Sequence, residues 1–206
     1  RSEIVKAFDV SLILYAEHSF NVSTFTARTI TSSLSDIHGA ITGAIASLKG
    51  PLHGGANEEV MHMLKKIKKP ENANKWTLNA LEKKKLIMGF GHRVYRKGDS
   101  RVPTMKKYYL KVAKLLNEKK LPKISQIVED IMIKKKGIHP NVDYPTGPTY
   151  HLMGFDTDFF TPIFVMSRIT GWSAHIMEQH TANKLIRPLS KYSGEKHRKV
   201  MLLNQR

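Results

Sequence analysis

Apolar residues recur every three or four positions along most of this chain, which is the spacing of one face of an α-helix. Val5, Phe8, Leu12 and Tyr15 give residues 4–16 such a face. The strongest pattern follows it and predicts a single long helix on the apolar positions Ala27, Ile30, Leu34, Ile37, Ile41, Ile45 and Leu48. Small residues crowd its other faces and allow close packing, so we expect this helix to be buried on several sides, at a subunit interface.

The same spacing continues after residue 56 and predicts five further helices. One runs to about Lys69 and is ended by Pro70, and the next spans about 75–86. Two amphipathic segments follow, at 105–116 and 124–132, and Thr161-Pro162 opens a last long helix that reaches about Asn183. No segment alternates apolar and polar residues as a strand does, so the predicted fold class is all-α.

Composition narrows the class of protein. The chain has 206 residues, of which 41% are hydrophobic, enough for a real core. No run of about 18 apolar residues exists, so no membrane span is predicted. The absence of cysteine excludes disulfides and thiolate chemistry and fits a reducing compartment. We therefore expect the cytoplasm, or the mitochondrial matrix if the source is eukaryotic.

The formal net charge of +17 makes a nucleic-acid-binding helical protein the alternative hypothesis. However, the lysines gather in short runs at the predicted ends of helices, where cations suit the negative end of the helix dipole and solvent. No zinc-finger spacing and no alternation of basic and aromatic residues accompanies them. The alternative predicts that the histidines and the aspartate discussed below do not converge.

Three separate segments frame one ionisable group each with glycine or proline. Residues 50–57, Gly-Pro-Leu-His-Gly-Gly-Ala-Asn, place His53 on a tight loop before a helix, whose positive end favours a neutral imidazole. Residues 88–95 place His92 beside Gly89 and Gly91, whose backbone N–H groups could face a ligand. Residues 137–148 hold Asp143 in a stiff loop. In isolation, His53 is more typical of a loop histidine beside a helix cap and Asp143 of an ordinary loop aspartate or Asx turn, and the glycines around His92 are a weak signal.

Taken together, these groups suit one reaction. A carboxylate that removes a proton from the methyl group of a thioester needs a partner that stabilises the enolate oxygen. Joining that carbon to a keto acid needs a donor on the keto oxygen and cations for the carboxylates. Two histidines, an aspartate and several arginines supply the parts of an aldol or Claisen condensation.

Four stretches in this order resemble the citrate synthase family, in particular the bacterial and archaeal citrate and 2-methylcitrate synthases. They are residues 17–28 (EHSFNVSTFTAR), 50–58 (GPLHGGANE), 89–95 (GFGHRVY) and 160–164 (FTPIF). The resemblance implies an all-helical homodimer with large and small domains, of which the N-terminal part of the large domain is absent from this sequence. It implies large-domain helices at 1–53, a small domain at 54–155 and a return to the large domain at 156–206.

The resemblance also implies a role for each matching residue. His53 would hydrogen-bond the thioester oxygen, Asp143 would be the base, and His92 would polarise the oxaloacetate carbonyl. Oxaloacetate would also be bound by His18, Arg101, Arg168 and Arg187, the last in the partner subunit's site. CoA would be bound by Ile87, Met88, Gly89, Phe90, Gly91 and Arg96.

The implied substrates are oxaloacetate with acetyl-CoA or propionyl-CoA, and the products are citrate or 2-methylcitrate with CoA. The choice of acyl group stays open, because one methylene in a pocket changes discrimination by only about 1–3 kcal/mol. No metal, other cofactor or nucleic-acid partner is expected. The family usually has Asp-Pro-Arg where this chain has Asp99-Ser100-Arg101, so we expect Arg101 to be held less rigidly.

Overall fold

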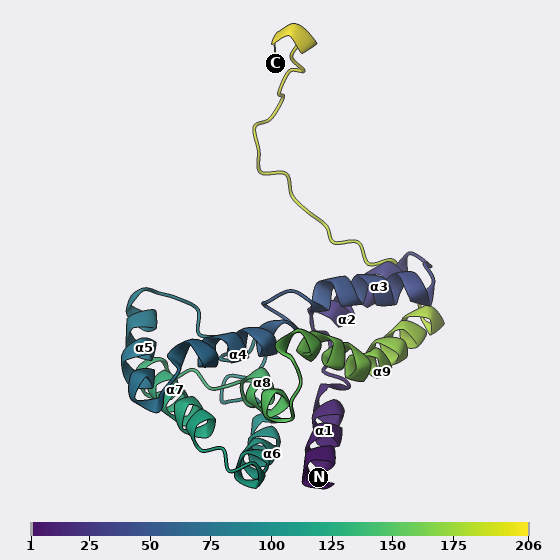
Figure 1. Ribbon diagram of the computed structural model, residues 1–206. Helices are drawn as coiled ribbons and strands as arrows, with labels where there is room; N and C mark the ends of the chain where they lie inside the picture. The colour runs from purple at the N-terminus through teal and green to yellow at the C-terminus, as the bar shows by residue number, and fades with distance from the viewer. Residues whose placement is uncertain (1, 206) are drawn as a thin grey trace.

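The computed structural model describes residues 2–205 and is helical throughout its folded part (Figure 1). The only strand-like pairing among these residues is an isolated antiparallel bridge between Phe90 and Pro140. The all-α prediction is confirmed. The helices are α1 Ser2–Tyr15, α2 Val22–Ser32, α3 Ile37–Leu48, α4 Ala56–Ile67, α5 Pro70–Glu82, α6 Val102–Leu115, α7 Lys120–Lys136, α8 Asp143–Leu152 and α9 Phe160–Thr181, with 3₁₀ turns η1 Thr157–Phe159 and η2 Leu203–Gln205.

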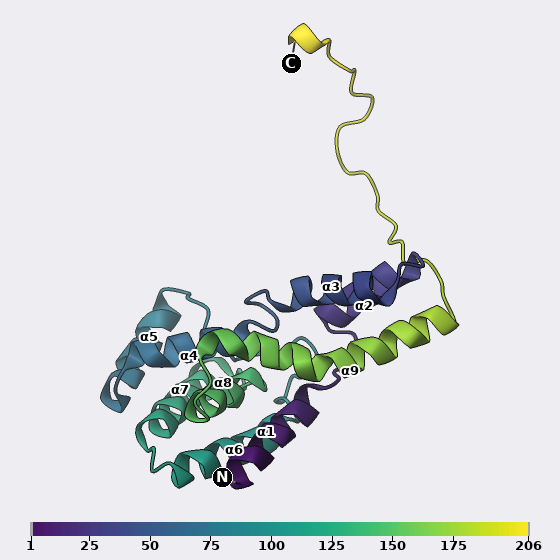
Figure 2. The same cartoon turned by 45° about the vertical axis from the view of Figure 1, so that its right-hand side comes forward.

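The helices form two groups that share α9 (Figures 1 and 2). In one group, α4, α5, α6, α7 and α8 bury a cluster that includes Val60, Leu64 and Ile124. In the other, α2, α3 and α9 pack around Trp172 and Leu48. α1 contacts α6 of the first group and α9 of the second, so its C-terminal end lies where the groups meet. No helix within residues 2–205 is long and apolar enough to cross a membrane.

The single long helix predicted across residues 27–48 is wrong. α2 ends at Ser32, Leu34 adopts a φ of 65°, and α3 starts three residues later. The Asp36 carboxylate accepts the Gly39 N–H at 2.8 Å and caps α3. Both helices contact α9, but the apolar stripe is only partly buried: Ala27 and Leu48 are buried, whereas Leu34, Ile37 and Ile45 are exposed. The pattern therefore found two helices that pack together but hid the cap between them.

Two other element boundaries differ from the predictions. Pro70 opens α5 instead of ending α4, as its fixed φ and missing N–H allow at a first helical position. The predicted loop around Asp143 is helical from that residue on, because Pro145 falls among the first residues of α8, where no N–H is needed. α9 starts at Phe160, and the N–H of Thr161 donates to the Glu58 carboxylate at 3.0 Å, so a side chain of α4 caps it.

Candidate active site

His53 lies on the turn between α3 and α4, and its ring is oriented by α2. Its Nε2 is 3.2 Å from the backbone N–H of Ser23 and 2.8 Å from the Ser23 hydroxyl. A backbone N–H can only donate, so Nε2 is an acceptor and the neutral ring carries its proton on Nδ1. Trp172 of α9 fixes the serine by donating its indole N–H to Oγ at 3.1 Å. His53 is therefore held as a neutral donor.

The pKa of His53 is lowered to about 4, first because the ring is desolvated and then because the Arg168 guanidinium is near. The expected neutral imidazole is thus present. The ring also contacts the amino end of α2, through the backbone N–H of Ser23. Two backbone N–H groups of the turn are already used, since those of His53 and Gly55 donate to Gly50 O at 2.9 and 3.2 Å.

His92 has the opposite tautomer. Its Nδ1 accepts the backbone N–H groups of Val94 at 3.1 Å and Tyr95 at 3.3 Å, so the proton of the neutral ring is on Nε2. Burial and Arg101 lower its pKa against the opposing effect of Asp99. The His18 ring meets it edge-on at 5.0 Å between centroids, and His18 Nε2 pairs with the Tyr95 hydroxyl at 2.9 Å. Burial and nearby cations lower the pKa of His18 to about 4.

Arg101 is held firmly, contrary to the expectation from its missing proline. Asp99 accepts its Nε at 3.0 Å, its Nη2 at 2.7 Å and its backbone N–H at 3.0 Å. The second Asp99 oxygen also accepts the N–H of Val142 at 3.0 Å, directly before Asp143. Burial alone would lower the pKa of Arg101, but the carboxylate outweighs it and the pKa is raised. The bidentate Asp99 carboxylate therefore fixes Arg101 although the proline that the family usually has at this position is missing.

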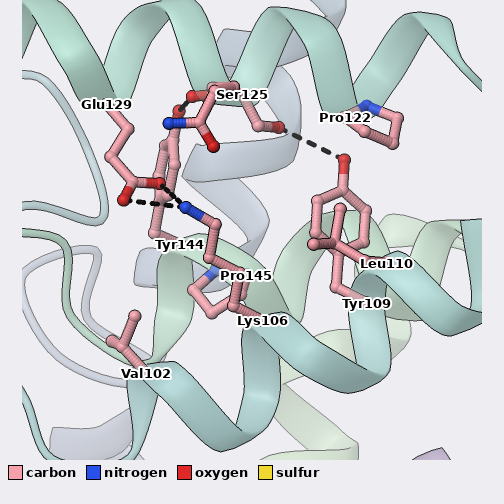
Figure 3. A pocket seen from close by; sticks show the side chains of 10 residues that line it. Val102, Lys106, Tyr109, Leu110, Pro122, Ser125, Glu129, Tyr144 and Pro145 are labelled. Carbon is pink, nitrogen blue, oxygen red and sulfur yellow. Dashed lines mark hydrogen bonds and ion pairs between the residues drawn. The ribbon is translucent and has the colours of Figure 1, made fainter.

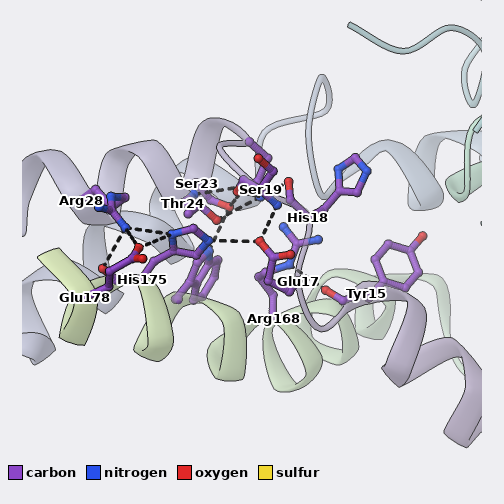
Figure 4. A network of polar contacts seen from close by, with 12 residues as sticks. Tyr15, Glu17, His18, Ser19, Ser23, Thr24, Arg28, Arg168, His175 and Glu178 are labelled. Carbon is purple, nitrogen blue, oxygen red and sulfur yellow. Dashed lines mark hydrogen bonds and ion pairs between the residues drawn. The ribbon is translucent and has the colours of Figure 1, made fainter. Parts of the chain in front are cut away.

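Arg168 is 1% exposed and lacks a carboxylate partner among the described residues. Its Nε donates to the Tyr15 carbonyl at 2.6 Å, its guanidinium lies over the Phe164 ring at 4.8 Å, and its Nη1 is buried with no partner. Burial, with help from Arg101, lowers its pKa to about 10. Figure 4 shows Arg168 beside Tyr15 and His18. A buried cation with an unused donor favours an anionic ligand.

Asp143 is the first residue of α8, and its Oδ1 accepts the hydroxyl of Tyr15 at 2.5 Å. Its backbone N–H donates to the Asn141 side chain at 3.1 Å. Desolvation raises the pKa of Asp143 to about 6, even though Tyr15, Arg101 and Arg168 lower it. A carboxyl with that pKa is ionised near neutrality and remains a stronger base than an exposed aspartate.

These groups lie around one centre. The centroid of the Phe164 ring is 4.1 Å from that of Tyr15 and 6.2 Å from that of His53. Tyr15 in turn donates its hydroxyl to Asp143. Arg168 affects the pKa values of His53, His18 and Asp143, and Arg101 affects those of His18, His92 and Asp143. Two shared cations thus influence His53, His92 and Asp143, which supports the predicted convergence and gives no support to the nucleic-acid alternative.

Residues 87–91, predicted to bind CoA, rest on the helix that begins with Asp143. Gly89 has a φ of 81°, and a Cβ there would meet Val60 and Tyr144 at 2.7–2.9 Å. The Tyr144 ring contacts Phe90 at 4.5 Å, and its hydroxyl donates to Ser125 O of α7 at 2.7 Å. Figure 3 shows Tyr144 lining a small pocket between α6, α7 and α8.

The backbone of this loop is only partly free. Gly91 N–H donates to His139 O and Gly89 O accepts Asn141 N–H, both at 2.9 Å. The glycine pattern suggested that the Gly91 N–H faces a ligand. It is instead used within the chain, by His139 O. Ile87 is buried, and Met88 packs against the same core.

Two predicted site residues lie outside the cluster. Arg96 is exposed on the loop before α6. Arg187 is exposed on the extended segment after α9, and its guanidinium donates only to Pro188 O at 3.1 Å within the described chain. That segment leaves the folded body (Figure 1). Among residues 2–205, no three histidine, cysteine or acidic residues gather as a metal site would need.

Three residues of the cluster were missed by the sequence patterns. Tyr15 has the spacing of a core residue, Ser23 that of a cap, and Asp99 that of a loop charge. Each forms its decisive bond with a group at least 30 residues away in the sequence: Asp143, His53 and Val142 respectively. Only the 99–101 spacing, which permits a bidentate pair, carried any local signal.

The lysine runs lie where the charge pattern predicted. Lys65-Lys66 and Lys134–136 occupy the last turns of α4 and α7, and Lys83–85 directly follow α5. They are exposed and spread over separate helix ends. They therefore form no single basic face along one element.

Comparisons with known proteins agree with this geometry. Residues 1–189 match the family model described as citrate synthase, C-terminal domain. A 2-methylcitrate synthase of Mycobacterium tuberculosis is 60% identical over 195 residues, covering 95% of this chain and 50% of that protein. The 2-methylcitrate synthase 2 of Corynebacterium glutamicum is 56% identical over 202 residues, covering 98% and 53%.

A solved structure matches the whole chain. It is citrate synthase from the archaeon Thermoplasma acidophilum in a ternary complex with carboxymethyl coenzyme A and oxaloacetate; the TM-score is 0.92 at 38% identity, covering 100% of this chain and 56% of that one. The chain spans about half the length of the curated relatives it matches. By fold, motif order and site geometry together, the chain belongs to the citrate synthase family.

Proposed function

We propose that this chain carries the catalytic centre of an acyl-CoA condensing enzyme that joins acetyl-CoA or propionyl-CoA to oxaloacetate. The observation that carries the proposal is the presence in one site of Asp143, whose pKa is raised to about 6, and of two neutral histidines with opposite tautomers. A base and two fixed donors around one centre are what an enolisation followed by carbonyl attack requires.

In the proposed reaction, Asp143 removes a proton from the carbon next to the thioester, and the Nδ1–H of His53 donates to the enolate oxygen. The new carbanion attacks the keto carbon of oxaloacetate, while the Nε2–H of His92 donates to the oxygen that becomes an alkoxide. Water then hydrolyses the thioester, releasing CoA and a tricarboxylate. Neutral donors suit these steps because they stabilise developing charge without protonating the base beforehand.

Oxaloacetate brings two carboxylates, for which Arg101 and Arg168 supply guanidinium groups. The unpartnered Nη1 of buried Arg168 supports this assignment, since a buried donor gains most from a charged acceptor. His18 lies against His92 and would complete the keto-acid side. Residues 87–91 and Arg96 would receive CoA.

We further propose that 1–53 and 156–206 belong to a large domain and 54–155 to a small one, and that two copies pair. Exposed apolar side chains on α2, on α3 and on the turn between them support a covered face there, among them Val22, Phe25, Leu34, Ile37 and Ile45. Arg187, remote from its own site, would then reach the partner's. The cytoplasm is the proposed compartment.

A thiol-release assay tests the function. The full-length protein is supplied with oxaloacetate and either acetyl-CoA or propionyl-CoA, and free CoA is followed with time. We expect release that depends on both substrates, and the ratio of the two kcat/KM values assigns the acyl group. Absence of release with either thioester, from a protein that binds oxaloacetate, would contradict the proposal.

A further inference from the structure

The end of α1 contacts three ionisable groups of the site: Asp143, Arg168 and Arg101. Tyr15, its last residue, is 1% exposed and donates its hydroxyl to Oδ1 of Asp143 at 2.5 Å. Its carbonyl accepts Arg168 Nε at 2.6 Å, and the carbonyl of Leu14 lies 3.5 Å from Arg101 Nη1. The last carbonyls of a helix have no partner within the helix, so they are available for such bonds.

We propose that Tyr15 is the positioning residue of the site: its hydroxyl holds one oxygen of Asp143 so that the other faces the acyl substrate. The same helix end aligns Arg168 and Arg101 with that carboxylate. The inference rests on the proposed function only in taking Asp143 as the base. The hydrogen bond itself does not depend on it.

The hydroxyl is needed for this role and not for packing. A phenylalanine would fill the same place between Phe164 and α8, and the apolar spacing of α1 does not distinguish the two residues. A buried hydroxyl costs free energy unless it is bonded, and this one is bonded to Asp143. Burial also raises the pKa of the phenol well above its usual range, so Tyr15 stays protonated and donates.

The groups around Asp143 determine in which direction its pKa should move when the Tyr15 hydroxyl is removed. Tyr15 from α1, Arg101 from the start of α6 and Arg168 from α9 each lower its pKa, while burial and Asp99 raise it. Tyr150 and Thr146 of α8 face Tyr15 as well. Removing the phenol removes one stabilising bond to the ionised form. The pKa of Asp143 must then rise.

Tyr15→Phe in the full-length protein tests this, with Tyr150→Phe as the matched control. Tyr150 is also fully buried between α1 and α8, but its hydroxyl donates to Ser11 Oγ at 2.9 Å. We expect Tyr15→Phe to move the acid limb of the kcat/KM profile for acyl-CoA to higher pH by about one unit. A shift of about this size corresponds to the loss of one charge-assisted hydrogen bond to the ionised carboxylate. Activity should fall about tenfold below that limb and recover above it. Tyr150→Phe should leave the limb in place.

A second readout does not require turnover. The carboxyl infrared band of Asp143, isolated by subtracting the spectrum of Asp143→Asn, is titrated in wild type and both variants. We expect its midpoint to rise in Tyr15→Phe alone. If wild type releases no CoA, the proposed function fails while this titration still decides the role of Tyr15.

Two results would overturn the inference: an unchanged midpoint and limb in Tyr15→Phe, or an equal shift in Tyr150→Phe. Should Tyr15→Phe not fold, a ring-fluorinated tyrosine at position 15 replaces it. Its more acidic phenol is a stronger donor, so the midpoint should move downward, and no movement would count equally against the role.

Discussion

The two sides of the site hold their ionisable groups in opposite ways. On the acyl side, His53 and Asp143 have no ion-pair partner among the described residues, and each is oriented by one hydroxyl or backbone group from another helix. On the keto-acid side, Arg101 is locked by three bonds to Asp99, and Arg168 is anchored to a backbone carbonyl. Desolvation is the largest influence on the pKa values of His53 and Asp143, whereas at Arg101 the Asp99 carboxylate outweighs desolvation and the pKa is raised.

The difference follows from the chemistry each side would perform. Proton transfer by Asp143 needs a pKa near the working pH, and burial raises that pKa to about 6. Burial also keeps the His53 ring neutral, as a hydrogen-bond donor to a developing oxyanion requires. Binding a dianion needs permanent charge at fixed positions, and guanidinium groups keep theirs even when buried. Substitutions should therefore lower kcat on the acyl side and raise KM for oxaloacetate on the other.

The largest effect is expected for Asp143→Ala. Without the carboxylate no other group accepts the proton, so kcat should fall by about 10³- to 10⁴-fold while oxaloacetate still binds. Thiol release and calorimetric titration with oxaloacetate measure the two quantities. Retained turnover would remove Asp143 from the acyl side altogether.

His53→Ala should lower kcat by about 10²- to 10³-fold, the typical loss for one donor to a developing oxyanion. The KM for oxaloacetate should change little, since the ring belongs to the acyl side. His62→Ala on α4 is the control, because that histidine is exposed and on no side of the site. An equal loss in both variants would show a general effect on α4 instead.

Arg168→Ala should raise the KM for oxaloacetate by about 10²-fold through loss of a charge-assisted hydrogen bond. Arg28→Ala is the matched control. Arg28 lies on α2 and pairs with Glu178, which is near the C-terminal end of α9, the helix that carries Arg168. Steady-state kinetics with varied oxaloacetate measure the effect. An unchanged KM in a folded variant would refute the keto-acid assignment.

Asp99→Asn joins the two sides in one experiment and should have the smallest effect. It releases Arg101, so the KM for oxaloacetate should rise about tenfold. It also removes the negative charge that raises the pKa of Asp143, so the acid limb near pH 6 should move to lower pH. This shift is opposite in sign to that of Tyr15→Phe. A rise in the KM for oxaloacetate without a shift of the acid limb would show that Asp99 acts on the keto-acid side alone and does not influence Asp143.

Much of this molecule follows from local patterns. The apolar spacing predicted the helices, because burying one face stabilises a helix wherever its partner lies. The glycine and proline frames marked His53, His92 and Asp143 as unusual, since such residues free or fix the backbone. What failed were boundaries: the apolar spacing continued through Asp36, and Pro145 and Pro148 resembled loop residues although α8 contains both.

The sequence by itself determined the helical class, the family motifs and the residue types available for chemistry, because these depend on neighbours along the chain. Only the tertiary structure decided which nitrogen of His53 carries the proton, that the Asp99 carboxylate also reaches Val142, and that Tyr15 holds Asp143. Those properties come from bonds and desolvation contributed by segments as much as 128 residues apart, and no local pattern encodes them.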